Sequence, residues 1–204
     1  MTHAQWVGII ALSSYLLGSL PFGLWIAKGL KGVDIRQVGS GNIGATNVGR
    51  ICGPIAGGVV FTLDVLKGLL PPLAARLLGL ESHWHVLMAL LAMVGHTYSV
   101  FLKFKGGKGI ATGLGAFLGT APIVGGLALS IWLVLVLINR YVSLSSLIAA
   151  FAIPFLMLVF HKGDPYRFGF GVVAFLLTLY KHQANIKRLR EGTEPKIKLP
   201  WVKS

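Results

Sequence analysis

Long uncharged apolar runs dominate this 204-residue chain and decide what it can fold into. Residues 4–27 form a run of 24 positions without a charge, and residues 110–139 form a run of 30. A helix of about 20 apolar residues is long enough to cross a bilayer. Only 12% of the residues are charged, whereas soluble domains average roughly 25%. The sequence therefore predicts an all-α membrane protein rather than a soluble domain.

The apolar runs divide into seven predicted spans. Further spans are expected at residues 54–78, 85–102, 143–160 and 166–185. The run of 30 would be about 45 Å long as one helix, which is too long for a hydrocarbon core of about 30 Å without strong tilt. Its segment Gly119-Thr120-Ala121-Pro122 is typical of a turn. We therefore expect a short helix and a second helix there.

The positions of the basic residues test this count, because Lys and Arg favour the cytoplasmic side of a membrane protein. With seven spans, 15 basic residues fall on one side and 3 on the other, whereas six spans give 9 on each. Seven transmembrane helices are therefore predicted, with the N-terminus outside and the C-terminus cytoplasmic. The net charge of +13 then reflects topology, and no nucleic-acid partner is expected. We expect one integral-membrane domain over residues 1–204, with about 195–204 forming a loose cytoplasmic tail.

A glycine-rich stretch, GSGNIGATNVGR at residues 39–50, lies between the first two predicted spans. Glycine lets backbone amides approach a ligand closely, and successive amides can form an anion site. Arg50 supplies a permanently charged fork that fits phosphate oxygens. The stretch contains the spacing of the dinucleotide fingerprint, but that motif needs a strand–turn–helix context, which is absent from the predicted structure. A phosphate-holding loop or a plain flexible connection are the two interpretations, and Asn42, Thr46, Asn47 and Arg50 favour the first.

A second stretch, Lys105-Gly106-Gly107-Lys108-Gly109, precedes the predicted helix that begins at Ile110. Positive-inside flanking explains its lysines but less well its three glycines. Two cations and a helix N-terminus suit a phosphate group. Both stretches are predicted to lie on the cytoplasmic face.

Polar groups at the ends of the last spans point to the same face. His182 and Asn185 are three residues apart, so on a helix they share one side. Ser143, Ser145 and Ser146 read first as a helix N-cap, with hydroxyls near the same face. Asp64 and Lys67 lie about ten residues into the second span, where ionisable groups are costly unless paired. We expect an internal ion pair there, with a cleft-lining role as the alternative.

The acidic residues and the single cysteine bear on whether the chain could hold a metal ion or form a disulfide. Six acidic residues that do not cluster with histidines make a metal site improbable, and no metal or other cofactor is expected. The single cysteine, Cys52, excludes an intramolecular disulfide.

Five stretches together resemble one enzyme family: residues 39–50 (GSGNIGATNVGR), 64–68 (DVLKG), 95–115 (GHTYSVFLKFKGGKGIATGLG), 140–146 (RYVSLSS) and 182–194 (HQANIKRLREGTE). The chain is similar to the bacterial membrane acyl-phosphate:glycerol-3-phosphate acyltransferases over nearly its full length. The resemblance implies a seven-span enzyme of the inner membrane that moves a fatty acyl group from acyl phosphate to the 1-position of glycerol 3-phosphate. The product is lysophosphatidic acid, and the active site lies on the cytoplasmic face. Acyl phosphate, glycerol 3-phosphate and membrane lipid are the implied partners, and a monomer is expected.

The resemblance also implies which residues act. Catalytic roles fall to His182, Asn185, Ser40 and Lys108, and phosphate binding falls to Ser40, Gly41, Asn42, Arg50, Lys105, Lys108 and Ser146. Acyl phosphate carries its own leaving group, so no protein nucleophile or covalent acyl-enzyme is required. The backbone amides of residues 40–42 are expected to hold phosphate together with Arg50 and Lys108. The base could be His182 or the phosphate of the substrate.

Two positions depart from the pattern of the family. Gln183 replaces its usual arginine and removes a positive charge, for which Lys187 and Arg188 could compensate. Ser99 replaces its usual proline, which is expected to loosen the end of the third span with little effect. An organophosphate or phosphate transporter is the alternative function, although its cations would lie near the bilayer midplane and often within internal repeats. A protein that only binds anionic lipids would explain the basic flanks but not the glycine-rich stretches.

Overall fold

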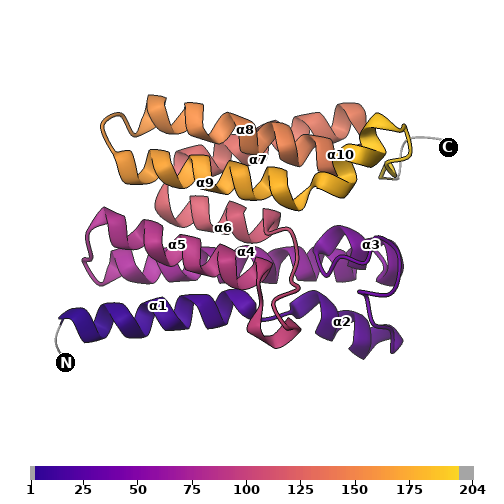
Figure 1. The fold of residues 1–204 in the computed structure, drawn as a ribbon, viewed down its shortest axis with the longest axis horizontal. Helices are drawn as coiled ribbons and strands as arrows, with labels where there is room; N and C mark the ends of the chain where they lie inside the picture. The colour runs from indigo at the N-terminus through magenta and orange to yellow at the C-terminus, as the bar shows by residue number, and fades with distance from the viewer. Residues whose placement is uncertain (1–2, 198–204) are drawn as a thin grey trace. The chain divides into compact units, whose positions relative to one another are not determined.

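The computed structural model describes residues 3–197, and every regular element among them is helical. The helices, labelled in Figure 1, are α1 (His3–Ser19), α2 (Phe22–Lys31), α3 (Ala45–Cys52), α4 (Pro54–Leu77), α5 (Ser82–Thr97), the 3-10 helix η1 (Val100–Leu102), α6 (Ile110–Thr120), α7 (Pro122–Asn139), α8 (Val142–Phe160), α9 (Pro165–Lys181) and α10 (Gln183–Arg190). Two compact units make up the chain, residues 1–122 and residues 123–204, called unit 1 and unit 2 below. The prediction of an all-α fold is confirmed for the described residues, and the single domain stays a prediction.

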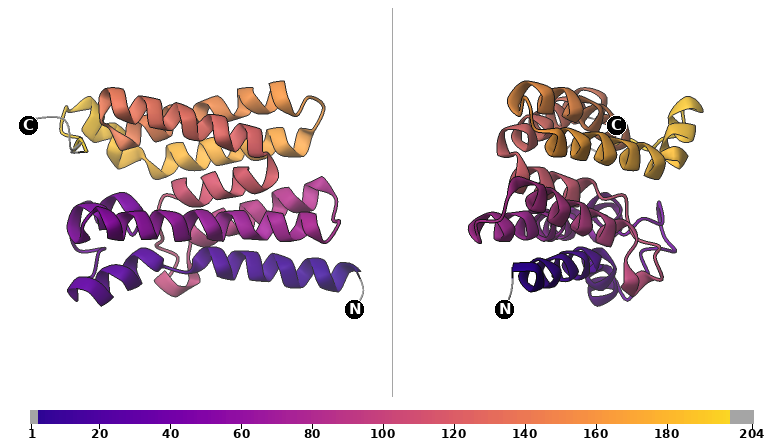
Figure 2. Two further views of the ribbon diagram at one scale, coloured as in Figure 1. Left: turned by 180° about the vertical axis from the view of Figure 1, so that it is seen from behind. Right: turned by 60° about the vertical axis from the view of Figure 1, so that its left-hand side comes forward.

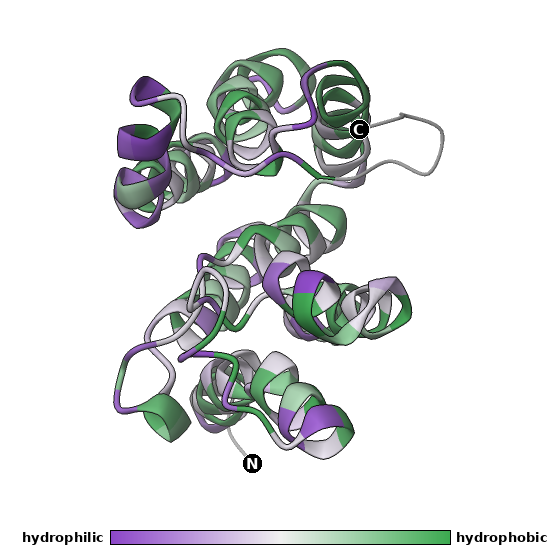
Figure 3. Ribbon diagram, turned by 90° about the vertical axis from the view of Figure 1, so that its right-hand side faces the viewer, coloured by the Kyte–Doolittle hydropathy of each residue, from purple (hydrophilic) through white to green (hydrophobic). Residues whose placement is uncertain are grey.

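Five helical segments of the described chain are long and apolar enough to cross a bilayer: Gln5–Lys31, Pro54–Leu77, Ser82–Leu102, Pro122–Asn139 and Val142–Phe160. The other two predicted spans correspond to α6 and α9, which have 11 and 17 residues. The count of seven and the orientation of the ends therefore stay predictions. Apolar residues cover most of the helices, while hydrophilic residues gather in the connections and in α10 (Figure 3).

The outer surfaces of these helices are apolar. Ile55, Ile138 and Val159 are 84%, 75% and 71% exposed. Many large exposed apolar side chains on long helices are typical of a surface that faces lipid or a partner. Together with the length of the helices, it identifies an integral membrane protein.

Prolines explain where two of the apolar runs break. The predicted span at residues 4–27 is two helices, because α1 ends at Ser19 and Pro21 precedes α2. Proline lacks an N–H group and disfavours the helical conformation in the residue before it. The predicted turn in the run of 30 is confirmed, since α6 ends at Thr120 and α7 begins at Pro122. The last predicted span also breaks, with His182 between α9 and α10.

The expectation of a loop throughout residues 39–50 was wrong, because α3 occupies Ala45–Cys52. Its Val48 is fully buried in a cluster with Ile43 and Val60, and Ile51 packs against the same cluster. Residues three apart lie on one face of a helix, so this short helix buries an apolar face. A Cβ on Gly57 of α4 would lie 2.8 Å from the Cα of Gly49 in α3, which shows how closely the two helices approach.

Unit 1 is held together by close approach of helix backbones. A Cβ on Gly68 of α4 would overlap the carbonyl oxygen of Thr112, and a Cβ on Gly115 of α6 would overlap that of Val65. Small residues at such crossings let membrane helices pack without bulky side chains between them. This packing brings the beginning of α6 against the middle of α4.

Unit 2 consists of α7 to α10, and α8 and α9 run side by side in both views of Figure 2. The indole Nε1 of Trp132 in α7 donates a hydrogen bond of 3.1 Å to Oγ of Ser146 in α8. Beyond α10, the amide of Ile197 donates to the carbonyl oxygen of Arg140 at 2.9 Å. The beginning of the predicted tail is therefore bonded to the connection before α8, and residues 198–204 lie outside the described part.

Candidate active site

The connection between α2 and α3 is built around the side chain of Asn47, which is 2% exposed. Its Nδ2 lies 3.2, 3.0 and 3.0 Å from the carbonyl oxygens of Ile35, Val38 and Asn42. Its Oδ1 accepts a hydrogen bond of 2.9 Å from the amide of Ser40. A Cβ on Gly39 would overlap that same oxygen. The described bonds of Asn47 therefore organise this loop from within (residues 32–44, called the Asn47 loop below).

Of the backbone amides of residues 40–42, which were expected to hold a phosphate, those of Ser40 and Gly41 are bonded within the loop. The Ser40 amide is bonded to Asn47, and the Gly41 amide donates to the carbonyl oxygen of Val38 at 3.1 Å. Gly41 has a φ of +69°, a conformation that glycine adopts without strain. Gly41 thus shapes the turn, while the Ser40 side chain is left exposed at its tip.

The loop ends in a helix that carries its cation. Oδ1 of Asn42 accepts a hydrogen bond of 2.8 Å from the amide of Gly44, the residue before α3. Arg50 is exposed in the last turn of α3. A second cation, Arg36, is engaged by Asp34 at 2.6 Å, and this contact lowers the pKa of Asp34 to about 2. Arg36 therefore contacts a carboxylate within the loop, and Arg50 lies in the last turn of the helix that follows the loop.

The connection from α5 to α6, here called the Lys108 loop (residues 103–109), folds back onto the end of α5. The amides of Gly106 and Gly107 donate hydrogen bonds of 3.1 Å to the carbonyl oxygens of Thr97 and His96. Gly109, with a φ of +80°, precedes the first turn of α6. The predicted start of this helix at Ile110 is confirmed. Lys105 is exposed and Lys108 is half-buried, so at least part of each residue reaches the surface of unit 1.

Unit 1 therefore brings the predicted phosphate-binding stretches to one side. In the right-hand view of Figure 2, the Asn47 loop and the Lys108 loop both project from the same side of unit 1. Ser40, Gly41, Asn42 and Arg50 belong to the first loop and its helix, and Lys105 and Lys108 to the second. That these two cationic, glycine-bearing turns converge on one site stays a prediction.

Unit 2 holds the remaining predicted residues. His182 is 2% exposed, and its Nδ1 lies 2.8 Å from the carbonyl oxygen of Thr178. A carbonyl only accepts hydrogen bonds, so this contact places the proton on Nδ1 and the lone pair of the neutral ring on Nε2. Asn185, three residues later, is 5% exposed. The two side chains are thus buried where α9 gives way to α10.

Glu194, to which the sequence had assigned no function, organises this end of unit 2. Its Oε1 accepts hydrogen bonds of 2.6 Å from Asn185 Nδ2 and from Ser143 Oγ. Its Oε2 accepts one of 2.7 Å from Nε of Arg188. The only signal in the sequence was an acidic residue within a strongly basic segment. Arg188 is therefore paired with a carboxylate, and compensation by Lys187 and Arg188 for the charge lost at Gln183 stays a prediction.

The serines of α8 do not form the predicted N-cap. Ser145 and Ser146 donate to the carbonyl oxygens of Tyr141 and Val142, four residues earlier, and no side chain caps the helix. Ser146 is 3% exposed and also accepts the bond from Trp132. Its bonds are therefore internal to unit 2, and Ser143 is the serine that reaches the Glu194 cluster.

Ser99 behaves differently from the expectation that it would loosen the end of α5. It is 1% exposed, and its hydroxyl donates a hydrogen bond of 2.6 Å to the carbonyl oxygen of Ser19 at the end of α1. Proline has no group that could make this bond. The replacement thus ties α5 to α1.

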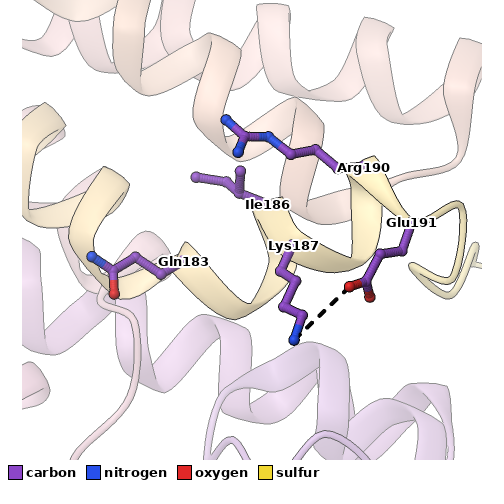
Figure 4. Close-up of a pocket in the computed structure, with 5 residues that line it drawn as sticks. All are labelled: Gln183, Ile186, Lys187, Arg190 and Glu191. Atoms are coloured by element: carbon purple, nitrogen blue, oxygen red, sulfur yellow. Dashed lines mark ion pairs between the residues drawn. The ribbon is translucent and has the colours of Figure 1, made fainter.

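A shallow pocket of about 350 Å³ lies on one face of α10. It is lined by Gln183, Ile186, Lys187, Arg190 and Glu191, and Figure 4 shows the ion pair of Lys187 and Glu191 on this face, at 3.9 Å. The departure at Gln183 therefore lies in this pocket. None of the residues assigned to the active site lines it.

Fold and site together define a helical integral membrane protein with cationic, glycine-rich turns suited to phosphate groups. The comparison with protein families narrows this class. A family model described as glycerol-3-phosphate acyltransferase matches residues 8–192, and the chain belongs to that family. The resemblance stated from the sequence motifs is thereby confirmed.

Relatives and solved structures agree. The glycerol-3-phosphate acyltransferase of Geotalea daltonii is 48% identical over 186 residues, covering 91% of this chain and 95% of that protein. The Geobacter sulfurreducens protein of the same name is 46% identical, covering 93% and 97%. PlsY (YgiH), an integral membrane glycerol 3-phosphate acyltransferase, has been solved in its glycerol 3-phosphate form. That structure is 41% identical with a TM-score of 0.88, covering 94% of this chain and 96% of PlsY. Its lysophosphatidic acid form has a TM-score of 0.85 at 40% identity, covering 94% and 95%.

Proposed function

We propose that this protein transfers a fatty acyl group from acyl phosphate to the 1-hydroxyl of glycerol 3-phosphate, giving lysophosphatidic acid and inorganic phosphate. The two solved forms of PlsY carry this proposal. Lysophosphatidic acid is glycerol 3-phosphate with one hydroxyl acylated, so the two forms correspond to the substrate and the product of one transfer. The reaction would be the first acylation of phospholipid synthesis.

The proposed chemistry needs no nucleophile from the protein. The hydroxyl oxygen of glycerol 3-phosphate attacks the acyl carbonyl carbon, and the bond from that carbon to the phosphate oxygen breaks. Phosphate leaves with the electron pair, and the hydroxyl proton passes to a base. The work left to the protein is to align two substrates and to neutralise negative charge.

The residues described above suit this division of work. Arg50, Lys105 and Lys108 supply cations for phosphate oxygens, and the exposed hydroxyl of Ser40 supplies a hydrogen bond beside Gly41 and Asn42. His182 and Asn185 are proposed to position the attacking hydroxyl. Ser146 is the weakest of the proposed ligands, because both of its described hydrogen bonds are internal to unit 2.

The proposed setting is a seven-span monomer in the bacterial inner membrane, with its active site on the cytoplasmic face. The apolar helices, the distribution of basic residues and the exposed lipid-type surface support this arrangement. A long acyl chain can enter from the bilayer, while glycerol 3-phosphate arrives from the aqueous side.

A direct assay tests the proposal. The purified protein in detergent is incubated with palmitoyl phosphate and labelled glycerol 3-phosphate. We expect equal amounts of lysophosphatidic acid and free phosphate. Palmitoyl-coenzyme A in place of palmitoyl phosphate should give no product. Product formation with palmitoyl-coenzyme A but not with palmitoyl phosphate would show that acyl phosphate is not the acyl donor. Uptake of glycerol 3-phosphate into vesicles without formation of lysophosphatidic acid would favour a transporter.

The Lys108 side chain offers the sharpest single variant. We expect Lys108→Ala to lower turnover about 100-fold or more, the scale reported for removing one preorganised group that stabilises charge. Lys162→Ala is the matched control, because Lys162 is an exposed lysine in the connection from α8 to α9. Both variants should keep the thermal unfolding midpoint of the wild type. Wild-type turnover in Lys108→Ala would remove this lysine from the mechanism.

A further inference from the structure

The strongest unexplained feature of unit 1 is a buried ion pair in α4. Nζ of Lys67 lies 2.7 Å from Oδ1 of Asp64, and the two side chains are 1% and 4% exposed. The ion pair expected from the sequence is thereby confirmed. Charges buried at this depth in a membrane helix are costly, and apolar residues of similar size often stabilise a protein equally well. The pair therefore calls for a reason other than stability.

One arm of this pair reaches the Asn47 loop. Nζ of Lys67 donates a hydrogen bond of 2.8 Å to the carbonyl oxygen of Leu20, at the break between α1 and α2. It also lies 5.5 Å from the centre of the Phe22 ring, at the start of α2. One residue further, a Cβ on Gly23 would overlap the carbonyl oxygen of Ile43. Lys67 thus fixes the position of the helix on which the Asn47 loop rests.

The other arm reaches the Lys108 loop. Nδ1 of His96, in the last turn of α5, lies 3.7 Å from the same Oδ1 of Asp64, and its side chain is 4% exposed. A Cβ on Gly107 would overlap Nε2 of that ring. The amide of Gly107 is bonded to the carbonyl oxygen of His96. The imidazole is therefore the surface against which the Lys108 loop is folded.

We propose that Asp64, Lys67 and His96 are positioning residues that hold the Asn47 loop and the Lys108 loop at a fixed spacing. Asp64 is the shared element, because one of its oxygens faces both Lys67 and His96. This inference rests on the proposed function, in which the two loops bind phosphate groups of the substrates. The three residues touch neither substrate. They act by setting where Ser40, Arg50 and Lys108 stand.

An ionic group suits this task better than an apolar one. Leucine packing in a helix bundle tolerates small sliding movements, whereas a cation with a carboxylate and a carbonyl as partners has one preferred place. Displacing a binding group by about 1 Å can lower the rate of an enzyme by about 100-fold. A buried pair that costs stability is then retained because it fixes geometry.

Hydrogen exchange of the loop amides, measured without substrate in lipid nanodiscs, tests the inference arm by arm. We expect His96→Leu to accelerate exchange of the Gly106 and Gly107 amides at least 10-fold and to leave that of the Ser40 and Gly41 amides within 2-fold. Lys67→Met should do the reverse, and Asp64→Asn should accelerate both sets. Ser14→Ala is the control, because Ser14 is equally buried in unit 1 but bonds only to Ile10 within α1 among its described contacts. Faster exchange across the whole of unit 1 in each variant would overturn the inference, as would unchanged exchange in both loops.

Kinetics supply the second readout. Each of the three variants should raise the KM for glycerol 3-phosphate at least 10-fold, and His96→Leu should add little to Asp64→Asn because both interrupt the same arm. If Lys67→Met does not fold, Lys67→Arg keeps the charge but changes its geometry, and it should show the same exchange pattern. Unchanged KM values in all variants would overturn the inference. If the wild-type protein gave no product with palmitoyl phosphate, the proposed function would be refuted. The hydrogen-exchange pattern would then still decide whether Asp64, Lys67 and His96 hold the two loops.

Discussion

Asn185 donates a hydrogen bond of 2.6 Å to Oε1 of Glu194, and Ser143, 51 residues before Glu194, donates to the same oxygen at 2.6 Å. This carboxylate, whose side chain is 5% exposed, thus joins the start of α8 to α10. Its presence fixes the orientation of the Asn185 amide, because a carboxylate accepts hydrogen bonds and therefore faces the Nδ2 donor. A residue proposed to meet the substrate is therefore oriented by one that does not.

Replacing Glu194 by glutamine tests this dependence. Glu194→Gln keeps the size of the side chain but removes the charge that Arg188 faces, and its amide cannot accept at both positions. We expect kcat to fall about 10-fold or more, because misoriented groups lose much of their effect. The measurement is steady-state turnover with the thermal midpoint recorded alongside. Glu191→Gln is the control, since Glu191 is exposed on α10. Equal loss in both variants would speak against a specific function of Glu194.

Acidification should weaken the same cluster. Burial by itself raises the pKa of Glu194, but hydrogen bonds from Ser143, Asn185 and Arg188 and the charge of Arg188 outweigh it and hold the pKa below its ordinary value of 4.5. Because the folded pKa is the lower one, the carboxylate stabilises the fold fully above the ordinary value, and this stabilisation is lost as pH falls through the folded pKa. We expect the thermal midpoint of the wild type to drop below about pH 4.5, and Glu194→Gln to drop less. Parallel curves for the two proteins would contradict this.

Much of the fold could be predicted from the sequence because it depends on local patterns. Uncharged runs predicted the long helices, and Pro122 predicted the break between α6 and α7. The spacing of Asp64 and Lys67 predicted their ion pair, because residues three apart on a helix are neighbours. Each of these features is decided by residues close together in the sequence.

The missed features depend on contacts between distant or irregular segments. Helix α3 has only eight residues and lies in a glycine-rich stretch, so the sequence predicted a loop there. Asn47 bonds to three carbonyl oxygens of a loop whose path no pattern predicts. The bond from Ser143 to Glu194 crosses 51 residues. Motifs therefore located the candidate site, but they did not show which of its polar groups face a ligand and which hold the loop together.

The Asn47 loop should lose its conformation when the side chain of Asn47 is removed. Asn47→Ala deletes the donors to three carbonyl oxygens and the acceptor for the Ser40 amide. We expect the KM for glycerol 3-phosphate to rise about 10-fold or more, since Ser40 and Arg50 then lose their fixed positions. Gln37→Ala is the matched control, because Gln37 is exposed in the same loop. A KM unchanged by Asn47→Ala would show that this loop does not set substrate affinity.

Two amide variants separate the two nitrogens of His182. The amide nitrogen of asparagine takes the place of Nδ1, which is bonded to Thr178, and that of glutamine takes the place of Nε2. If Nε2 of His182 is the base that accepts the hydroxyl proton, His182→Asn should keep the local fold and lose about 100-fold or more in turnover. His182→Gln should lose both the bond and the activity. Turnover of His182→Asn close to that of the wild type would shift the function of base to the phosphate of the substrate.

Cysteine labelling can decide the seven-span topology that the proposed active site requires. Cys52 is first replaced by serine, and single cysteines are placed at Gln37, Lys105, Lys162 and Arg190, which lie in or next to four connections of the described chain. In intact cells, a membrane-impermeant maleimide should label only Lys162→Cys, because the predicted topology places that connection outside and the other three positions in the cytoplasm. After permeabilisation all four should react, which controls for accessibility. If Gln37→Cys and Lys105→Cys were labelled from opposite sides of the membrane, the Asn47 loop and the Lys108 loop could not serve one pair of phosphate-bearing substrates. The proposed mechanism would then be untenable even though the family assignment would stand.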